Sequence, residues 1–221
     1  MTSANDPMLR FLGSFRCRPR ATDAAIAESE QRLGLKLPKE YVAFLRLCNG
    51  GDGVIGDEEY AILWSVEELA SLNDRYEVQS YVPGLLIFGS NGGGEAYGFD
   101  TRIPNWPIVS VPFVGMEWEL AEPIGASFSL CLERLYQTKE LSESESMSDH
   151  NRESGITASQ SRGKEIFEIH PVILGGSPTD PANKVVLNRA EHMQAVVYWN
   201  RVIAEIRRQK KEAMKKEPPG K

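Results

Sequence analysis

The apolar positions of residues 23–51 recur at helical spacing in two successive stretches separated by a tight break. In the first stretch, Ile26 and Leu33 lie seven residues apart, on one face of a helix that Asp23 can cap at its N-terminus. Gly34 follows where a left-handed C-cap residue is needed. The second stretch has one apolar face, formed by Tyr41, Phe44, Leu45 and Cys48. The pattern predicts a helix pair whose shared apolar face needs a sheet to cover it.

Farther along the chain, short apolar runs alternate with turn residues, as is typical of antiparallel strands. Strands are predicted at residues 60–64, 85–88, 96–99 and 108–111. Ser65 and Glu68 have the spacing of a capping box and predict a helix after the first strand. Between residues 114 and 121 every second residue is apolar, which predicts a further strand with one face in water. With a closing helix from Ser127, the pattern predicts an α+β fold, a mainly antiparallel sheet backed by helices.

The ordered residues of the helix pair resemble the opening signature of the SUKH superfamily. They are Leu33-Gly34, Leu37-Pro38, Tyr41, Phe44-Leu45 and Asn49-Gly50. The run LLIFGSNGGGEAYGFD, the strand around Ile108 and the helix opening with Ser127-Phe128 are also similar to that family in order and spacing, over roughly residues 20–139. The superfamily contains fungal cell-wall-synthesis regulators and bacterial immunity proteins that neutralise toxins. The resemblance implies a SUKH-like sheet that acts as a protein-binding module and has no catalytic residues.

The composition is that of an ordinary globular protein, with 221 residues, 41% hydrophobic and 25% charged. No apolar run reaches the roughly 20 residues of a membrane span, and the N-terminus makes a poor signal peptide. The cysteines, Cys17, Cys48 and Cys131, are scattered and odd in number, which argues against a disulfide framework and a zinc site. We therefore expect a reduced, cytoplasmic protein in which Cys48 and Cys131 are small core residues.

Charge is distributed unevenly along a chain whose net charge is −6. The formal net charge is +3 for residues 1–49, −11 for residues 50–125 and +4 for residues 164–221. An acidic middle repels nucleic acid, which proteins bind by neutralising phosphates with Lys and Arg, and it suits a basic protein partner. The residues expected to contact that partner are Asp57, Glu58, Glu59, Glu117, Glu119 and Glu122.

Shifts in composition divide the chain into five parts. Residues 1–20 are expected to be a loosely ordered lead-in, and residues 20–139 to form the SUKH-like α+β domain. Residues 140–163 are rich in Ser and Glu and have no apolar period, which predicts a flexible, protease-sensitive linker beside a folded core. Residues 164–208 are predicted to form a small strand–loop–helix unit, and residues 209–221 a disordered basic tail.

The C-terminal unit carries residues in the order of a metal-dependent HNH nuclease. His170, a double glycine, Asn183 and His192 follow that order; in such a site a His activates water and an Asn holds the loop. The usual pair of adjacent metal-site residues is missing, because Ile169 precedes His170, and alignment on the glycines puts Glu168 where the general base should be. We therefore favour an interpretation in which His170 and His192 brace a structural unit.

Three functions fit these observations. The favoured one is an immunity protein that blocks a toxin, possibly a basic nuclease, by direct binding, without catalysis. The others are a divergent metal-dependent nuclease with His170 and His192 in its site, and a regulatory scaffold for another protein partner. The glycine run at residues 92–94 leads into Glu95 and a strand, so it predicts a hairpin turn and no nucleotide site. We expect no cofactor, no metal, and no nucleic-acid or membrane partner, and the sequence leaves the oligomeric state open.

Overall fold

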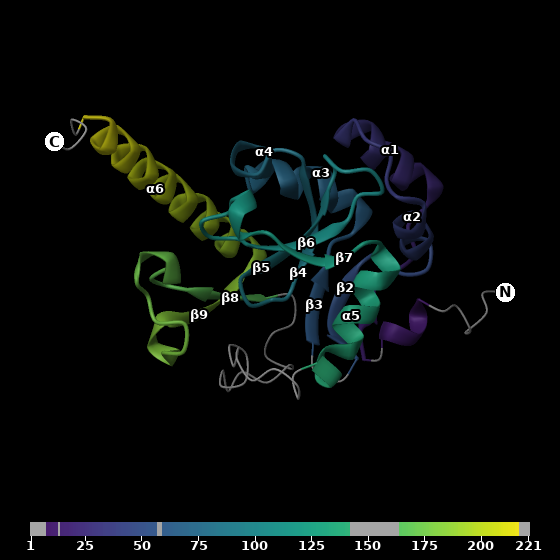
Figure 1. Cartoon of the computed structure of the whole chain (residues 1–221). Coiled ribbons are helices and arrows are strands. Elements are labelled where there is room, and N and C mark those ends of the chain that lie inside the picture. The colour runs from purple at the N-terminus through teal and green to yellow at the C-terminus, as the bar shows by residue number, and fades with distance from the viewer. Residues whose placement is uncertain (1–7, 13, 57–58, 142–163, 217–221) are drawn as a thin grey trace.

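The fold is built on one antiparallel sheet whose seven strands lie side by side in chain order (Figure 1). The computed structural model describes residues 8–12, 14–56, 59–141 and 164–216. The strands are β1 (Arg16–Cys17), β2 (Gly51–Ile55), β3 (Glu59–Leu63), β4 (Leu85–Ser90), β5 (Glu95–Asp100), β6 (Ile108–Pro112) and β7 (Glu122–Gly125). Residues 91–94 form the predicted β4–β5 turn, in which Asn91 Oδ1 accepts hydrogen bonds from the backbone N–H groups of Gly93 and Glu95.

Helices pack against this sheet and complete its core. They are α1 (Asp23–Leu33), α2 (Lys39–Leu45), α3 (Val66–Arg75), α4 (Val78–Tyr81) and α5 (Phe128–Leu141), with short 3-10 turns η1 (Leu9–Leu12) and η2 (Trp118–Leu120). Tyr41 of α2 lies between the sheet and α5, with its ring centroid 5.2 Å from that of Phe99 and 5.0 Å from that of Phe128. All three rings are buried. The predicted α+β fold, a mainly antiparallel sheet backed by helices, is confirmed.

The helix pair has the predicted elements with small shifts at their ends. Thr22, and not Asp23, caps α1: its backbone is extended and its hydroxyl accepts a hydrogen bond from the Ala25 N–H at 3.1 Å. Asp23 is already the first helical residue. Gly34 is left-handed as predicted (φ 67°). The helical spacing of Pro38 would suit the first position of the second helix, but Pro38 is the N-cap residue and α2 begins at Lys39.

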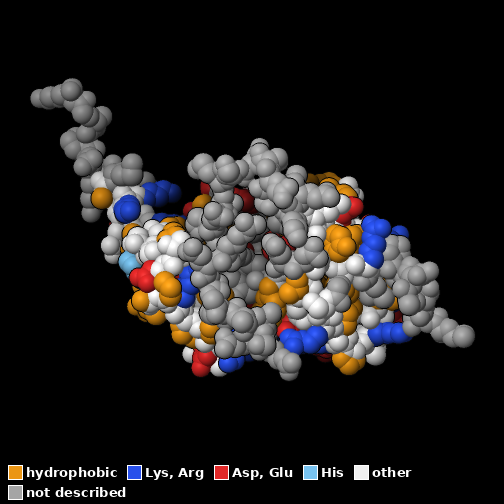
Figure 2. All heavy atoms as spheres, turned by 90° about the horizontal axis from the view of Figure 1, so that it is seen from below, with side chains coloured by type: hydrophobic (Ala, Val, Ile, Leu, Met, Phe, Trp, Pro, Cys, Tyr) orange, Lys and Arg blue, Asp and Glu red, His pale blue; other side chains and the backbone are white. Residues whose placement is uncertain are grey.

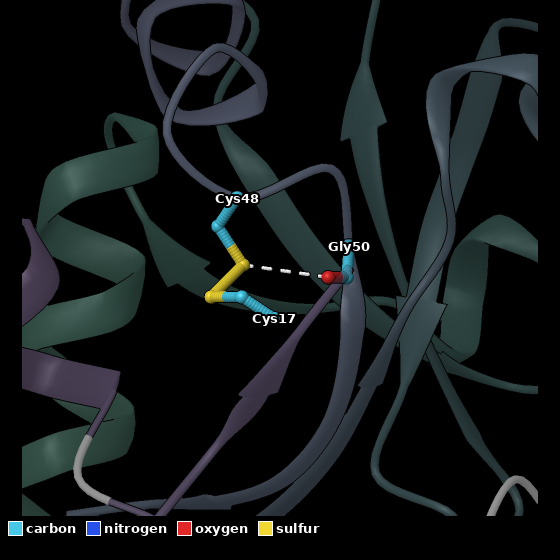
Figure 3. The surroundings of a disulfide bond; sticks show 3 residues. All are labelled: Cys17, Cys48 and Gly50. Carbon is cyan, nitrogen blue, oxygen red and sulfur yellow. Dashed lines mark hydrogen bonds between the residues drawn. A yellow bond between two sulfur atoms is a disulfide. The ribbon is translucent and has the colours of Figure 1, made fainter. Parts of the chain in front are cut away.

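A disulfide joins Cys17 to Cys48, so the expectation of reduced cysteines without a disulfide is wrong (Figure 3). β1 pairs with β2 in a register that sets Cys17 opposite Gly51, and this brings Cys17 beside the end of α2. The two Cα atoms lie 5.1 Å apart, within the range that a disulfide bridges. The Sγ of Cys48 also lies 3.3 Å from the carbonyl oxygen of Gly50. Cys131 is buried and free, as expected of a core residue.

The strand predicted at residues 114–121 is absent, and a bend followed by η2 stands in its place. Gly115 has φ 79°, a left-handed value that interrupts an extended chain. Trp118 is then held by polar and cationic contacts: its indole N–H donates to the carbonyl of Pro83 at 3.1 Å, and the Arg102 guanidinium lies 3.3 Å from its ring centroid. The alternation of apolar and other residues at positions 114–121 therefore belongs to an irregular loop with contacts on both sides, and not to a strand.

The C-terminal unit, residues 164–216, is a two-stranded hairpin followed by a long helix. It contains β8 (Lys164–Glu168), β9 (Lys184–Asn188) and α6 (Arg189–Lys216), with the turns η3 (Val172–Leu174) and η4 (Pro181–Asn183) between the strands. The tail predicted to be disordered from residue 209 is helical as far as Lys216. The predicted linker lies outside the described residues from residue 142 onward. Among the described residues, none of the helices combines the length and apolar character that a membrane span requires.

Candidate partner-binding surface

The acidic residues expected to bind a partner lie at different places around the sheet. Asp57 and Glu58 are outside the described residues, and Glu59 is the first residue of β3. Glu119 lies in η2 and Glu122 begins β7, and both are exposed. The water-facing strand on which Glu117 and Glu119 were expected does not exist, because the chain bends there.

Part of the acidic block, residues 50–125, is paired with arginines from the same chain. Glu117 pairs with Arg207 of α6, whose guanidinium lies 2.8 Å from its carboxylate. Three of the arginines belong to the C-terminal unit and two to the segment before α1. The pairs are Arg16–Asp52, Arg18–Glu68, Arg102–Asp100, Arg189–Glu68, Arg201–Glu77 and Arg207–Glu117. These arginines thus balance part of the uneven charge seen in the sequence.

Glu68 is the point where the three charged segments meet. Its carboxylate lies 2.7 Å from both the Arg18 and the Arg189 guanidinium groups, and it accepts a hydrogen bond from the Ser65 N–H of the predicted capping box. Burial alone would raise the pKa of Glu68, but Arg189, the Ser65 N–H and Arg18 outweigh it and hold that pKa below its usual value. The Glu68 carboxylate is therefore engaged by contacts within the molecule.

Three glutamates at the end of the sheet remain without a cation, and we call Glu95, Glu122 and Glu168 the acidic edge. Among the described residues, no Lys or Arg pairs with any of the three carboxylates. Glu95 accepts a hydrogen bond from the Ser110 hydroxyl at 3.1 Å, and Ser110 lies opposite Glu122 in the β6–β7 register. Burial raises the pKa of Glu95, and the negative charges of Glu122 and Glu168 raise it further despite the Ser110 bond. Excess negative charge therefore persists at this edge.

The loop between β8 and β9 is held by Asn183. Asn183 Oδ1 accepts from the His170 N–H at 2.8 Å, and its Nδ2 donates to the carbonyls of His170 and Ser177, each at 2.9 Å. Gly176 is required because a Cβ at this position would lie 1.8 Å from the His170 carbonyl oxygen. Asn183 and Gly176 thus have a clear structural role in the loop.

The two histidines occupy different environments. His170 is exposed, with its ring centroid 6.3 Å from that of Trp199. His192 is buried, and its Nδ1 lies 2.9 Å from the Tyr76 hydroxyl, with the rings of Phe113 and Phe167 edge-on to it. Burial lowers the pKa of His192 to about 4, so the imidazole is neutral. No three described His, Cys, Asp or Glu side chains are grouped as a metal site would require.

The C-terminal unit packs into the domain through buried polar groups. The Ser90 hydroxyl donates to the Glu165 carboxylate (2.8 Å), and Glu165 is only 1% exposed. Burial raises the pKa of Glu165 to about 7, against the opposing effects of Ser90 and Arg189. Asn200 of α6 donates to the Phe113 carbonyl at 2.9 Å and accepts from the Gly115 N–H at 2.6 Å. Sequence reasoning missed Glu165 and Asn200 because neither belongs to a local motif.

A hollow of about 420 Å³ opens between the start of α2 and the start of α5. Phe99 and Phe128 line its apolar part, and Lys36 and Lys39 stand at its edge beside Trp106. Hydrophobic side chains are also exposed over the C-terminal unit, on the left in Figure 2. Ile169, Val172 and Ile173 are the exposed apolar residues of its loop. Both regions can take part in contacts with another protein.

The model of the SMI1 / KNR4 family (SUKH-1) matches residues 20–134, which is more than half of the chain. The chain belongs to the SMI1 / KNR4 family. No curated protein matches it. The superfamily predicted from the helix-pair signature is confirmed, and family membership is consistent with an immunity-type protein-binding module.

The SMI1 / KNR4 match begins just before α1 and ends within α5, so it leaves out the entire C-terminal unit. Two members of the acidic edge, Glu95 and Glu122, lie in the matched region, while Glu168 lies in the unit. The acidic edge is therefore composed of residues from both parts. The cytoplasmic location expected from the sequence remains a prediction.

Proposed function

We propose that this SMI1 / KNR4-family protein neutralises a toxin by binding it directly, and that the acidic edge meets a basic surface of that toxin. The observation that carries the proposal is the clustering of Glu95, Glu122 and Glu168, none of which pairs with a described Lys or Arg. Glu68, Glu77 and Glu117, by contrast, are paired with arginines. Complementary charge across an interface speeds association, which favours an antidote that must act before its toxin does.

The proposal is tested with the toxin domain encoded beside this protein, by measuring association kinetics at two ionic strengths. We expect the double variant Glu122→Lys/Glu168→Lys to lower the association rate roughly tenfold or more at low salt and to weaken its salt dependence. Both positions lie at the molecular surface, so circular dichroism should show an intact fold. Cells that co-express the toxin with this double variant should be protected less than cells with the natural protein, in proportion to the fall in association rate.

The matched control is Glu28→Lys/Asp74→Lys, which changes the charge equally at exposed positions on α1 and α3. It should bind like the natural protein. If both double variants lower the association rate equally, only the net charge of the protein matters. If Glu122→Lys/Glu168→Lys leaves the association rate unchanged, the role of the acidic edge is refuted. The triple change of Asp57, Glu58 and Glu59 to Lys tests the remaining predicted contacts, with Glu117 and Glu119 as further single positions.

The protein is proposed to have no catalytic activity, and the C-terminal nuclease is the competing function. Its support is the residue order His170, double glycine, Asn183 and His192, together with a loop that Asn183 braces. Against it, His192 faces Tyr76 inside the core and cannot reach a metal that His170 would hold at the surface. Incubation with DNA or RNA and Mg²⁺ or Ni²⁺ separates the two: cleavage that disappears in both His170→Ala and His192→Ala would establish the nuclease. A regulatory scaffold with a non-toxin partner would bind that partner but give no protection against the toxin.

A further inference from the structure

The Cys17–Cys48 bridge joins two residues that lie in different environments (Figure 3). Cys17 is exposed, whereas Cys48 is buried in the core. A disulfide opens when a thiolate attacks one of its sulfur atoms and the other sulfur leaves, and exposed bridges are the ones that react readily. Because Cys17 is at the surface, an outside thiol reaches the bridge from that side, and Cys48 is then the leaving group.

The core side of the bridge can accommodate the reduced state. The Gly50 carbonyl oxygen lies 3.3 Å from the Sγ of Cys48 and also accepts the Arg18 N–H at 2.9 Å. A disulfide sulfur has no proton to donate, but a thiol has one, and a carbonyl has two lone pairs. The thiol of reduced Cys48 thus has an acceptor in place. Helix α2 does not need the bridge to stay packed, because Tyr41 and Phe44 are buried.

On its outer side, the bridge ties down a segment that has no buried side chain. We call residues 16–20 the strap; all five are exposed, while Phe15 and Ala21 at its two ends are buried. The strap contains β1 and covers the outer edge of β2. The chain runs so close to β2 there that a Cβ added at Gly53 would lie 2.7 Å from the Phe15 Cα. Release of the strap would therefore open the edge of β2.

Two ion pairs of the strap are partly open to solvent. They join Arg16 to Asp52 and Arg18 to Glu68, and all four side chains are partly or largely exposed. Solvent and salt screen such pairs, so they contribute little. The β1–β2 ladder has two residue pairs, against five between β2 and β3. The bridge is therefore the covalent restraint on a segment whose ladder is short and whose ion pairs are weak.

We propose that the Cys17–Cys48 bridge is a redox switch, opened by a low-molecular-weight thiol, and that its opening releases the strap from β2 while the core stays folded. A thiolate bonds to the Sγ of Cys17 as the S–S bond breaks, and the electron pair of that bond leaves with Cys48, which takes a proton from water. A second thiolate attacks the outer sulfur of the mixed disulfide and frees Cys17 as a thiolate, which is protonated in turn. Two small thiols are oxidised to their disulfide, and the protein bridge is reduced.

The switch does not depend on the proposed toxin binding. β1 and β2 lie at the other end of the strand order from β7, which carries Glu122 of the acidic edge. A protein that fails to bind a toxin can therefore still show the switch, and a protein without the switch can still bind.

Oxidised glutathione, added to two full-length variants, tests which sulfur reacts. In Cys48→Ser the thiol of Cys17 remains, and mass spectrometry should detect its mixed disulfide with glutathione. In the matched variant Cys17→Ser the buried Cys48 remains, and it should react roughly tenfold more slowly or less. Buried Cys131 is present in both as an internal control, and circular dichroism checks that both are folded. Absence of the adduct in Cys48→Ser, or equal rates in the two variants, would overturn the proposal.

Hydrogen exchange of the natural protein, oxidised and after reduction by glutathione without denaturant, tests release of the strap. We expect the N–H groups of residues 16–20 to exchange roughly tenfold faster or more after reduction, because their local opening no longer works against the bridge. At these early times β4 and β5 should stay protected in both states. Reduction that requires denaturant, or a strap that exchanges equally in both states, would overturn the proposal. So would loss of protection in β4 and β5 together with the strap, because the core would then open as well.

Discussion

The family domain, residues 20–134, and the C-terminal unit are stabilised by contacts of different range. In the domain each strand pairs with the next strand in the chain. The unit has one local strand pair, and its other key contacts lie far back in the sequence: Glu165 to Ser90 spans 75 residues, His192 to Tyr76 spans 116 and Arg189 to Glu68 spans 121. A segment held in this way is a part of the domain's core, although it lies outside the family match.

Deletion of residues 142–221 should have the largest effect on stability, and it tests whether the C-terminal unit belongs to the core of the domain. Four buried side chains of the unit, Phe167, Met193, Val196 and Ile203, would be lost. At about 1.5–3 kcal/mol each, their removal would cost roughly 6–12 kcal/mol, which is comparable to the whole stability of a typical domain. We therefore expect the shortened chain to be unfolded or aggregated, as urea unfolding followed by circular dichroism would show.

A matched experiment separates loss of the unit from loss of chain continuity. A recognition site for a specific protease, inserted within residues 142–163, allows the chain to be cut after folding. We expect the two fragments to stay together on gel filtration because the buried contacts persist. Separation into a folded core near residues 20–139 and a free unit would support the independent modules expected from the sequence, and would contradict the integrated core.

The next effect concerns the domain alone, through the Cys17–Cys48 disulfide. Because the bridge closes a loop of 31 residues in sequence separation, chain entropy predicts that opening it lowers the free energy of unfolding by roughly 4 kcal/mol. Reductant should lower the urea midpoint of the natural protein. Cys17→Ser should show the lower midpoint with or without reductant. If reductant leaves the natural protein unchanged, the bridge contributes nothing to stability.

The pH dependence of the free energy of unfolding tests the contact between the C-terminal unit and the family domain, where His192 and Glu165 are buried. His192 has its pKa lowered from 6.5 to about 4 in the fold, so the unfolded chain binds more protons between those pH values and the free energy of unfolding falls as pH falls. Glu165 has its pKa raised from 4.5 to about 7, so the folded chain binds more protons and the free energy of unfolding falls as pH rises. Between pH 4.5 and 6.5 the two effects oppose each other.

Replacing either His192 or Glu165 should reveal the effect of the other group on the pH dependence of the free energy of unfolding. In His192→Phe the free energy of unfolding should drop by roughly 3 kcal/mol from pH 4.5 to 7, since a shift of one pKa unit corresponds to about 1.4 kcal/mol. In Glu165→Gln it should rise by a similar amount from about pH 4 to 6.5. Urea midpoints measured across this range check both, with the exposed His170→Phe as control. Variants that follow the natural protein at every pH would show that neither group titrates with folding.

The smallest effect is expected for the ion pair between Glu117 and Arg207, both of which are partly exposed. Such pairs contribute about 0–1 kcal/mol, because solvent and salt screen them. A double-mutant cycle with Glu117→Ala and Arg207→Ala should give a coupling energy in that range, and it should shrink at high salt. A coupling of several kcal/mol would mean that charge, and not the buried contacts around Asn200, attaches α6 to the domain.

The elements recognised from the sequence are those whose signals are local. Gly34, the Ser65–Glu68 capping box and the turn after Ser90 each act within a few residues, and the structure has all three. The alternation at residues 114–121 was misleading, because Gly115 and the environment of Trp118 are set by residues from Pro83 to Arg207. The Cys17–Cys48 bridge depends on the β1–β2 register, which the number of cysteines cannot reveal.

The candidate site was predicted only in part for the same reason. Counting charges located the acidic block, but it could not show that Glu68, Glu77 and Glu117 are paired with arginines from other segments. Glu122 was identified as a candidate and belongs to the acidic edge, whereas Glu95 of β5 and Glu168 of β8 come near it only in the fold. His192 was correctly placed at the start of a helix, but the ring that it contacts, Tyr76, lies too far back in the chain for sequence reasoning to find.

The span between Tyr76 and His192 also has a consequence for synthesis. A ribosome adds about 5–20 residues per second, so His192 emerges on the order of ten seconds after Tyr76. During that interval the strands β2–β7 can pair, but the faces of Tyr76 and Phe113 that contact His192 remain uncovered. The nascent chain therefore passes through a stage with exposed apolar surface, in which chaperones have time to bind. Emergence of α6 from the ribosome, more than the formation of the sheet, is then the event that completes this core.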